Sequence, residues 1–150
     1  GFGKEKFVEL CVDADIDGLI VPDLPYEEYD ELKPLLDETN VYMIPLVALT
    51  SEDRIPMLVK ESKGFVYCVS SLGVTGVRKE FDTRIDSFVA KVKEATDTPA
   101  CIGFGISTKA DVERFDKIAD GCIVGSAIVR KIFDSKMNID EIKAFVSSLK

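Results

Sequence analysis

Histidine is absent from the 150 residues of this sequence. The absence excludes a histidine general base, a Ser-His-Asp triad and a metal site built on imidazole. Cysteine is scarce and has no CxxC spacing, with thiols only at Cys11, Cys68, Cys101 and Cys122. Three of these lie in apolar runs, where a free thiol behaves as a small hydrophobic side chain. We therefore expect free core thiols, neither disulfides nor metal ligands, and a cytoplasmic protein.

Basic residues are also fewer than acidic residues. The chain has 19 Lys and Arg against 27 Asp and Glu, for a formal net charge of −8. This excess opposes non-specific binding to nucleic acid and attraction to anionic membranes. In addition, no apolar run reaches the roughly 20 residues that a membrane span needs. The composition, 46% hydrophobic and 31% charged, is that of a globular domain.

Apolar runs and helix-like segments alternate along the chain. Continuous apolar runs occupy residues 17–23, 42–47, 64–70, 98–104 and 120–126. Segments with helical spacing occupy residues 4–13, 27–39, 52–62, 84–96, 109–118, 127–133 and 140–149. Apolar strands without internal alternation are typical of a parallel sheet, and their regular alternation with helices predicts parallel βα units in one domain. A doubly wound sheet and a (β/α)8 barrel both fit this pattern.

The chain opens on a helical segment with no strand before it. Phe7, Val8, Leu10 and Cys11 are spaced to form one apolar stripe. A domain rarely begins within a βα unit, so we expect residues 1–150 to be one portion of a longer domain. Such a portion would leave two open sheet edges, and we expect it to self-associate or to fold only marginally by itself.

Glycines follow three of the apolar runs, where the carboxyl ends of parallel strands form binding sites. They occur in the segments 70–76 (SSLGVTG), 103–107 (GFGIS) and 125–129 (GSAIV). Glycine permits close approach of the backbone to a ligand, and a helix beginning at Gly125 and Ser126 would offer free N–H groups to an anion. These glycines therefore predict a phosphate site, although each alone is also compatible with a simple turn. A dinucleotide fingerprint is not supported, because no third glycine follows Gly103 and Gly105.

Few residues are candidates for acid–base chemistry. Asp23 ends the first apolar run, where a catalytic carboxylate could lie, but an Asp between prolines commonly forms a turn or a helix cap. Tyr67 lies within the third run, where core packing and a place on the barrel interior are both open.

Four motifs stand in order along the chain: residues 17–25 (DGLIVPDLP), 64–76 (GFVYCVSSLGVTG), 103–107 (GFGIS) and 120–129 (DGCIVGSAIV). They resemble, in turn, the fourth strand, the sixth strand with its mobile loop, the seventh strand and the eighth strand of tryptophan synthase alpha subunits. The resemblance implies an α/β fold, a (β/α)8 TIM barrel, that is incomplete here, with about strands 4 to 8 and their helices.

The same resemblance implies a function for the intact protein. Members of this family cleave indole-3-glycerol phosphate to indole and glyceraldehyde 3-phosphate in tryptophan biosynthesis. They need no cofactor or metal, and they act with a PLP-dependent beta subunit in an alpha2beta2 assembly. The resemblance implies a phosphate grip at Gly76, Gly105, Gly125 and Ser126. It implies indole-pocket walls at Ile20, Pro22, Leu46, Tyr67 and Phe104, and a site-closing loop residue at Thr75.

One departure from the family pattern is important. The family uses a Glu near the end of the second barrel strand and an Asp in the following loop, and no carboxylate here matches either motif. The resemblance therefore places no catalytic residue in this chain, and we expect the chain alone to be inactive.

Two alternatives remain at this point. One is another phosphate-binding barrel, such as an isomerase of tryptophan or histidine synthesis, which the segments Gly73–Gly76 and Pro22–Pro25 disfavour. The other is a non-catalytic half-barrel that binds phosphate esters or modulates a partner.

Overall fold

The computed structural model describes residues 3–24, 26–70, 78–103 and 105–150. The strands are β1 (Gly18–Leu19), β2 (Tyr42–Met43), β3 (Leu46–Ala48), β4 (Val66–Val69), β5 (Ala100–Gly103) and β6 (Gly121–Ile123). The helices are α1 (Lys4–Asp13), α2 (Tyr26–Asp37), the 3-10 helix η1 (Leu49–Arg54), α3 (Ile55–Val59), α4 (Arg78–Ala95), α5 (Lys109–Phe115), α6 (Ser126–Asp134) and α7 (Ile139–Ser148). Strands and helices alternate as the sequence predicts.

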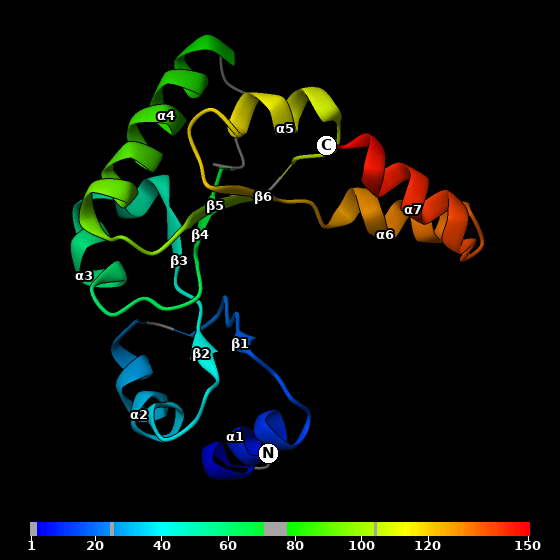
Figure 1. The fold of residues 1–150 in the computed structure, drawn as a ribbon. Coiled ribbons are helices and arrows are strands. Elements are labelled where there is room, and N and C mark those ends of the chain that lie inside the picture. Colours follow the sequence, from blue (N-terminus) through cyan, green and yellow to red (C-terminus); the bar gives the residue numbers. More distant parts are fainter. Residues whose placement is uncertain (1–2, 25, 71–77, 104) are drawn as a thin grey trace.

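All strand pairs are parallel. β1 pairs with β2, and β3 to β6 form a four-stranded sheet in chain order (Figure 1). Chain-order pairing of parallel strands, each followed by a helix, is the arrangement of a (β/α)8 barrel and not of a doubly wound sheet. The expected fold class is confirmed, for part of a barrel.

The segment predicted as one strand at 42–47 forms two short ladders instead. Ile44 still donates a backbone hydrogen bond to Leu19 at 2.8 Å, but Pro45 has no N–H to continue the ladder. Its carbonyl accepts from Tyr67 at 2.9 Å, so the segment changes partner from β1 to β4 at this proline. The helix predicted at 52–62 is likewise divided, into η1 and α3.

The main core lies between one face of the four-stranded sheet and the helices α3 and α4. Its centre is fully buried, with Val47, Cys68 and Ile102 from the strands and Phe88 and Val92 from α4 each 0% exposed. A smaller core joins α1 and α2 through Val8, Cys11, Leu32, Leu36 and Val41. The predicted apolar stripe of α1 is therefore only half buried, because Phe7 and Leu10 remain about 40% exposed (39% and 41%).

The opposite face of the four-stranded sheet is less covered. Leu46, Tyr67, Cys101 and Gly121 lie level with one another across the four strands, and all four are half-buried. Their neighbours Val47, Cys68 and Ile102 point the other way, into the core. In a closed barrel, the half-buried face is the interior.

All four cysteines have free thiols. Burial raises the pKa of Cys68 to about 12 and that of Cys122 to about 11, with nearby carboxylates adding to both shifts. Both thiols are therefore protonated and poorly nucleophilic near neutral pH. Among the described residues, no helix is long and apolar enough to cross a membrane.

Candidate functional site

The four-stranded sheet ends at one common edge. Ala48, Val69 and Gly103 lie side by side at the carboxyl ends of β3, β4 and β5, and Ile123 lies beside Gly103 at the end of β6. The segments that leave these strands therefore emerge together. This edge is where parallel βα folds bind their ligands, and it brings the predicted glycines 105 and 125 to the same end of the sheet.

The first turn of α6 is a candidate anion site. Gly125 is the N-cap of this nine-residue helix, and no described side chain caps the helix with a hydrogen bond. Gly125 and Ser126 are both exposed, and a Cβ built on Gly125 would meet no described atom within 4 Å. The free N–H groups of the first turn, the helix dipole and the Ser126 hydroxyl therefore face open space, as phosphate binding requires.

The neighbouring helix α5, in contrast, has a capped N-terminus. Thr108 and Asp111 form a capping box, in which the Thr108 hydroxyl accepts from the Asp111 N–H at 3.2 Å. The Asp111 carboxylate accepts from the N–H groups of Ser107 at 3.0 Å and Thr108 at 2.9 Å. Burial opposes the charge of this carboxylate, but these hydrogen bonds outweigh burial and lower the pKa of Asp111. The capping box thus uses donors of the kind that no described side chain occupies at the start of α6, so α6 is the better candidate for an anion site.

Gly105 lies between β5 and α5 in the sequence. Its φ of +76° lies in the left-handed region, which favours glycine. A Cβ there would contact no described atom within 4 Å. Glycine is therefore required at this position by the backbone conformation, and its N–H lies on a loop that leaves the same sheet edge as Gly125.

Tyr67 lies on the half-buried face and reaches the end of β5. An ideal Cβ on Gly103 would come within 2.7 Å of three atoms of the Tyr67 ring and hydroxyl. The phenol therefore occupies the space that a side chain at 103 would need. Leu46 is its partner across β3 and β4, so Tyr67 and Leu46 form a continuous apolar wall.

Ser70 ties the ends of two strands together. Its hydroxyl donates to the Gly103 carbonyl at 2.7 Å, and its backbone N–H donates to the same oxygen at 3.0 Å. Only 4% of Ser70 is exposed. Sequence reasoning missed this positioning role of Ser70 and the packing role of Gly103, although a serine directly after a buried strand was a usable signal.

We expect Gly103→Ala to destabilise the protein by about 1–3 kcal/mol, the usual effect of overpacking, because the new methyl group collides with Tyr67. Urea unfolding measures the loss. In a double-mutant cycle with Tyr67→Ala, most of the added effect of Gly103→Ala should disappear. An undiminished effect in the Tyr67→Ala background would show that Tyr67 is not the residue that excludes a side chain at 103.

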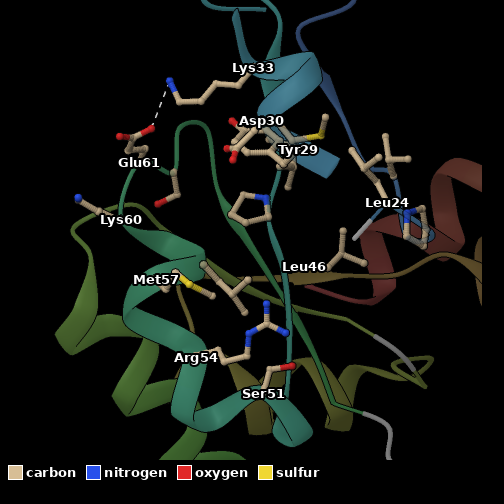
Figure 2. A pocket seen from close by; sticks show the side chains of 17 residues that line it. Leu24, Tyr29, Asp30, Lys33, Leu46, Ser51, Arg54, Met57, Lys60 and Glu61 are labelled. Atoms are coloured by element: carbon tan, nitrogen blue, oxygen red, sulfur yellow. Dashed lines mark ion pairs between the residues drawn. The ribbon is translucent and has the colours of Figure 1, made fainter. Parts of the chain in front are cut away.

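A cavity of about 410 Å³ lies between α2 and α3 (Figure 2). Two predicted indole-pocket residues, Pro22 and Leu46, line it, whereas Ile20 and Tyr67 do not. Much of its wall comes from the two helices, including Lys33, which pairs with Asp37 at 2.6 Å and Glu61 at 3.2 Å. The structure therefore gathers only part of the predicted indole wall in this cavity, and Ile20 is 44% exposed.

Three predicted site residues lie outside the described part of the chain: Gly76, Thr75 and Phe104. Asp23 is described and is exposed in a turn that the Leu24 N–H closes on the Val21 carbonyl at 3.3 Å. The turn-forming interpretation of Asp23 thus agrees with the structure.

The parallel sheet and its chain-order pairing define the class of the protein. It is part of a (β/α)8 barrel, with the exposed start of α6 at its carboxyl edge. The sequence profile described as Tryptophan synthase alpha chain matches residues 1–150. The chain belongs to this family.

Individual relatives agree with this assignment. The tryptophan synthase alpha chain of Bacillus thuringiensis (strain Al Hakam) is 49% identical, over 99% of this chain and 57% of the relative. The structure of tryptophan synthase subunit alpha from Campylobacter jejuni matches with a TM-score of 0.89 at 36% identity, over 99% of this chain and 60% of that protein. A tryptophan synthase structure from Mycobacterium tuberculosis matches with a TM-score of 0.82 at 29% identity, over 99% and 55%. This chain therefore spans little more than half the length of such relatives.

Proposed function

We propose that this chain supplies the phosphate- and indole-binding part of a lyase that cleaves indole-3-glycerol phosphate to indole and glyceraldehyde 3-phosphate. The observation that carries the proposal is the family match over all 150 residues. The exposed start of α6, which no described side chain caps, supports it, because a helix start of this kind suits a phosphate monoester.

In this proposal the phosphate binds the first-turn N–H groups of α6 and the Ser126 hydroxyl, with Gly105 and Gly76 supplying further backbone N–H groups. Leu46 and Tyr67 form the apolar wall for the indole ring, with Ile20, Pro22 and Phe104 completing it. Binding at both ends of the substrate fixes the scissile bond between them and lowers the entropic cost of reaction. Thr75 belongs to the loop that closes over the site and excludes water.

The proton transfers need groups that this chain does not provide. Retro-aldol cleavage requires one group to protonate the indole ring carbon and another to accept the glycerol hydroxyl proton. We assign these to a Glu and an Asp in the part of the family fold that the chain does not span. No cofactor is needed for these steps, and the intact protein would pass indole to a beta subunit in the cytoplasm.

Assays of the purified chain test the proposal. We expect the chain to bind glycerol 3-phosphate in calorimetry and to release no indole from indole-3-glycerol phosphate. The assignment would be contradicted if the chain alone released indole and the Asp23→Asn variant did not, because the acid–base group would then lie in this chain. Failure to bind glycerol 3-phosphate at millimolar concentration would contradict the proposed phosphate-binding site.

A further inference from the structure

The backbone on both sides of Gly105 is held in place. Before it, the Gly103 carbonyl accepts two hydrogen bonds from Ser70, one from the hydroxyl at 2.7 Å and one from the backbone N–H at 3.0 Å. After it, Ile106 is only 3% exposed in the main core, and the capping box at the start of α5 holds the residues that follow. Gly105 itself is exposed, with a φ of +76°. Its N–H direction is therefore set by the anchors on either side.

The two donors of Ser70 have different consequences. The backbone N–H continues the ladder between β4 and β5, one residue beyond the last pair, Val69 and Gly103. The hydroxyl adds a second donor to the same oxygen, and a carbonyl with two donors is more narrowly oriented than a carbonyl with one. Among the residues that the structure describes, Ser70 is the only polar residue buried this deeply, at 4% exposure. An alanine there would leave the ladder intact, so the hydroxyl is suited to orienting the end of β5.

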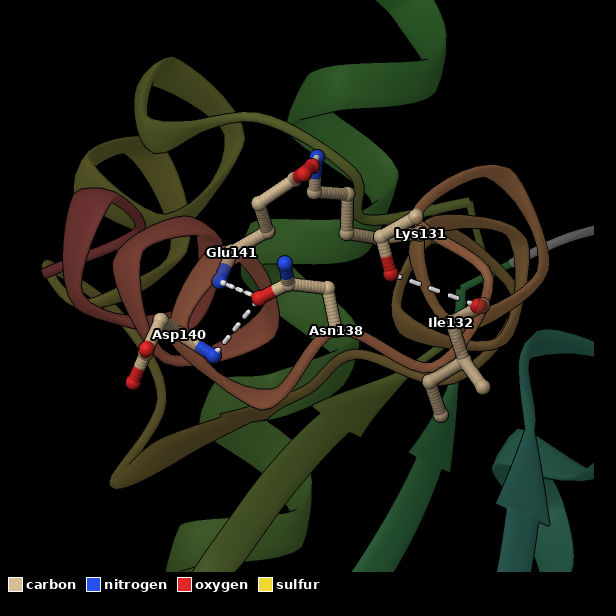
Figure 3. Close-up of polar contacts among 6 residues, drawn as sticks. Lys131, Ile132, Asn138, Asp140 and Glu141 are labelled. Atoms are coloured by element: carbon tan, nitrogen blue, oxygen red, sulfur yellow. Dashed lines mark hydrogen bonds and ion pairs between the residues drawn. The ribbon is translucent and has the colours of Figure 1, made fainter.

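The helix α6 is held by contacts that do not involve Ser70. Lys131 on α6 pairs with Glu141 on α7 at 2.6 Å. Asn138 caps α7, and its side-chain oxygen accepts from the Glu141 N–H at 3.2 Å (Figure 3). A change at Ser70 should therefore act on Gly105 and leave the start of α6 in place.

We propose that Ser70 is a positioning residue for phosphate binding, whose hydroxyl fixes the Gly103 carbonyl and so directs the Gly105 N–H toward an anion at the start of α6. The role of Ser70 rests on the proposed function, because the anion is the phosphate monoester of that substrate. Ser70 does not itself touch the phosphate, since it is buried and its hydroxyl donates to Gly103. Fixing a donor before the ligand arrives lowers the cost of ordering it on binding.

An amide NMR titration of the isotope-labelled chain with glycerol 3-phosphate tests this role. In the parent chain, the amide resonances of Gly105 and Ser126 should shift together with one Kd. In Ser70→Ala, the Kd should rise about two- to thirteenfold and the Gly105 shift should shrink, while the Ser126 shift remains. The Gly103 carbonyl keeps its backbone donor in this variant, so we expect Ser70→Ala to fold.

Ser62→Ala is the matched control. The Ser62 hydroxyl also donates to a backbone carbonyl, that of Val59 at 2.8 Å, but Ser62 precedes β4 and lies at the amino end of the sheet. We expect Ser62→Ala to leave the Kd and both shifts unchanged. The amide of Glu141, which Asn138 holds, should not shift in any variant and serves as an internal reference.

The results separate the role of Ser70 from the proposed function. Weaker binding with a selective loss of the Gly105 shift in Ser70→Ala supports the role. A Ser70→Ala variant with the Kd and shifts of the parent would overturn it and leave the proposed function standing. Equal loss of the Gly105 and Ser126 shifts, or the same loss in Ser62→Ala, would also overturn it, because the change would then be a general loss of structure. If neither amide shifted in the parent chain, the proposed phosphate site would be wrong, and the role of Ser70 with it.

Discussion

Ser126→Asp is expected to weaken glycerol 3-phosphate binding by at least about a hundredfold without destabilising the fold. The new carboxylate would sit in the first turn of α6, where it interacts favourably with the helix dipole by about 0.3–1 kcal/mol. It would also occupy the N–H groups that we propose bind phosphate, and it would repel the phosphate charge. Two unit charges 4 Å apart near a protein surface repel by about 4 kcal/mol, more than the roughly 2.7 kcal/mol that a hundredfold loss requires. Calorimetric titration with glycerol 3-phosphate measures the effect.

Two control variants separate charge from structure in that experiment. Ser126→Ala removes one hydrogen bond, worth about 0.5–1.5 kcal/mol, and should weaken binding only about two- to thirteenfold. Asn138→Asp places a carboxylate at the N-cap of α7, whose first-turn donors are already satisfied, and should leave binding unchanged. If Ser126→Asp bound glycerol 3-phosphate as well as the parent chain, the phosphate grip would lie elsewhere.

The order and type of the elements were predictable because their determinants are local. Continuous apolar runs mark buried parallel strands, and the helix at 4–13 has the bounds that its spacing predicts. The break at Pro45 was harder to predict from the sequence. A proline is tolerated at the edge of a strand, and only the change of partner from β1 to β4 shows that the run divides here.

Some features of the candidate site could be predicted from the sequence, and others could not. The place of Gly125 and Ser126 at a helix start could be predicted from the sequence, because a strand followed by Gly-Ser and a helical segment is a local pattern. The contact between Tyr67 and Gly103 joins residues 36 positions apart and depends on the register of β4 against β5. Likewise, Tyr67 is half-buried because the helices cover the other face of the sheet. Strand periodicity alone does not specify the face that the helices cover.

Phe88→Ala and Phe133→Ala are expected to have very different effects, although they remove the same atoms. Phe88 on α4 is 0% exposed in the main core, and its truncation leaves a cavity that should cost about 3–5 kcal/mol. Phe133 on α6 is 76% exposed, so its truncation should change the free energy of unfolding by less than about 0.5 kcal/mol. Urea unfolding of dilute protein, compared at equal m-values, measures both effects.

The concentration dependence of this pair then reports on self-association of the chain. If two copies bury Phe133 against each other, Phe133→Ala should become more destabilising as the protein concentration rises, because association stabilises only the folded state. Phe88→Ala should cost the same at every concentration, since the helix α4 and the sheet bury it without a partner. An effect of Phe133→Ala that stays below about 0.5 kcal/mol at every concentration would show that Phe133 lies outside the contact between copies.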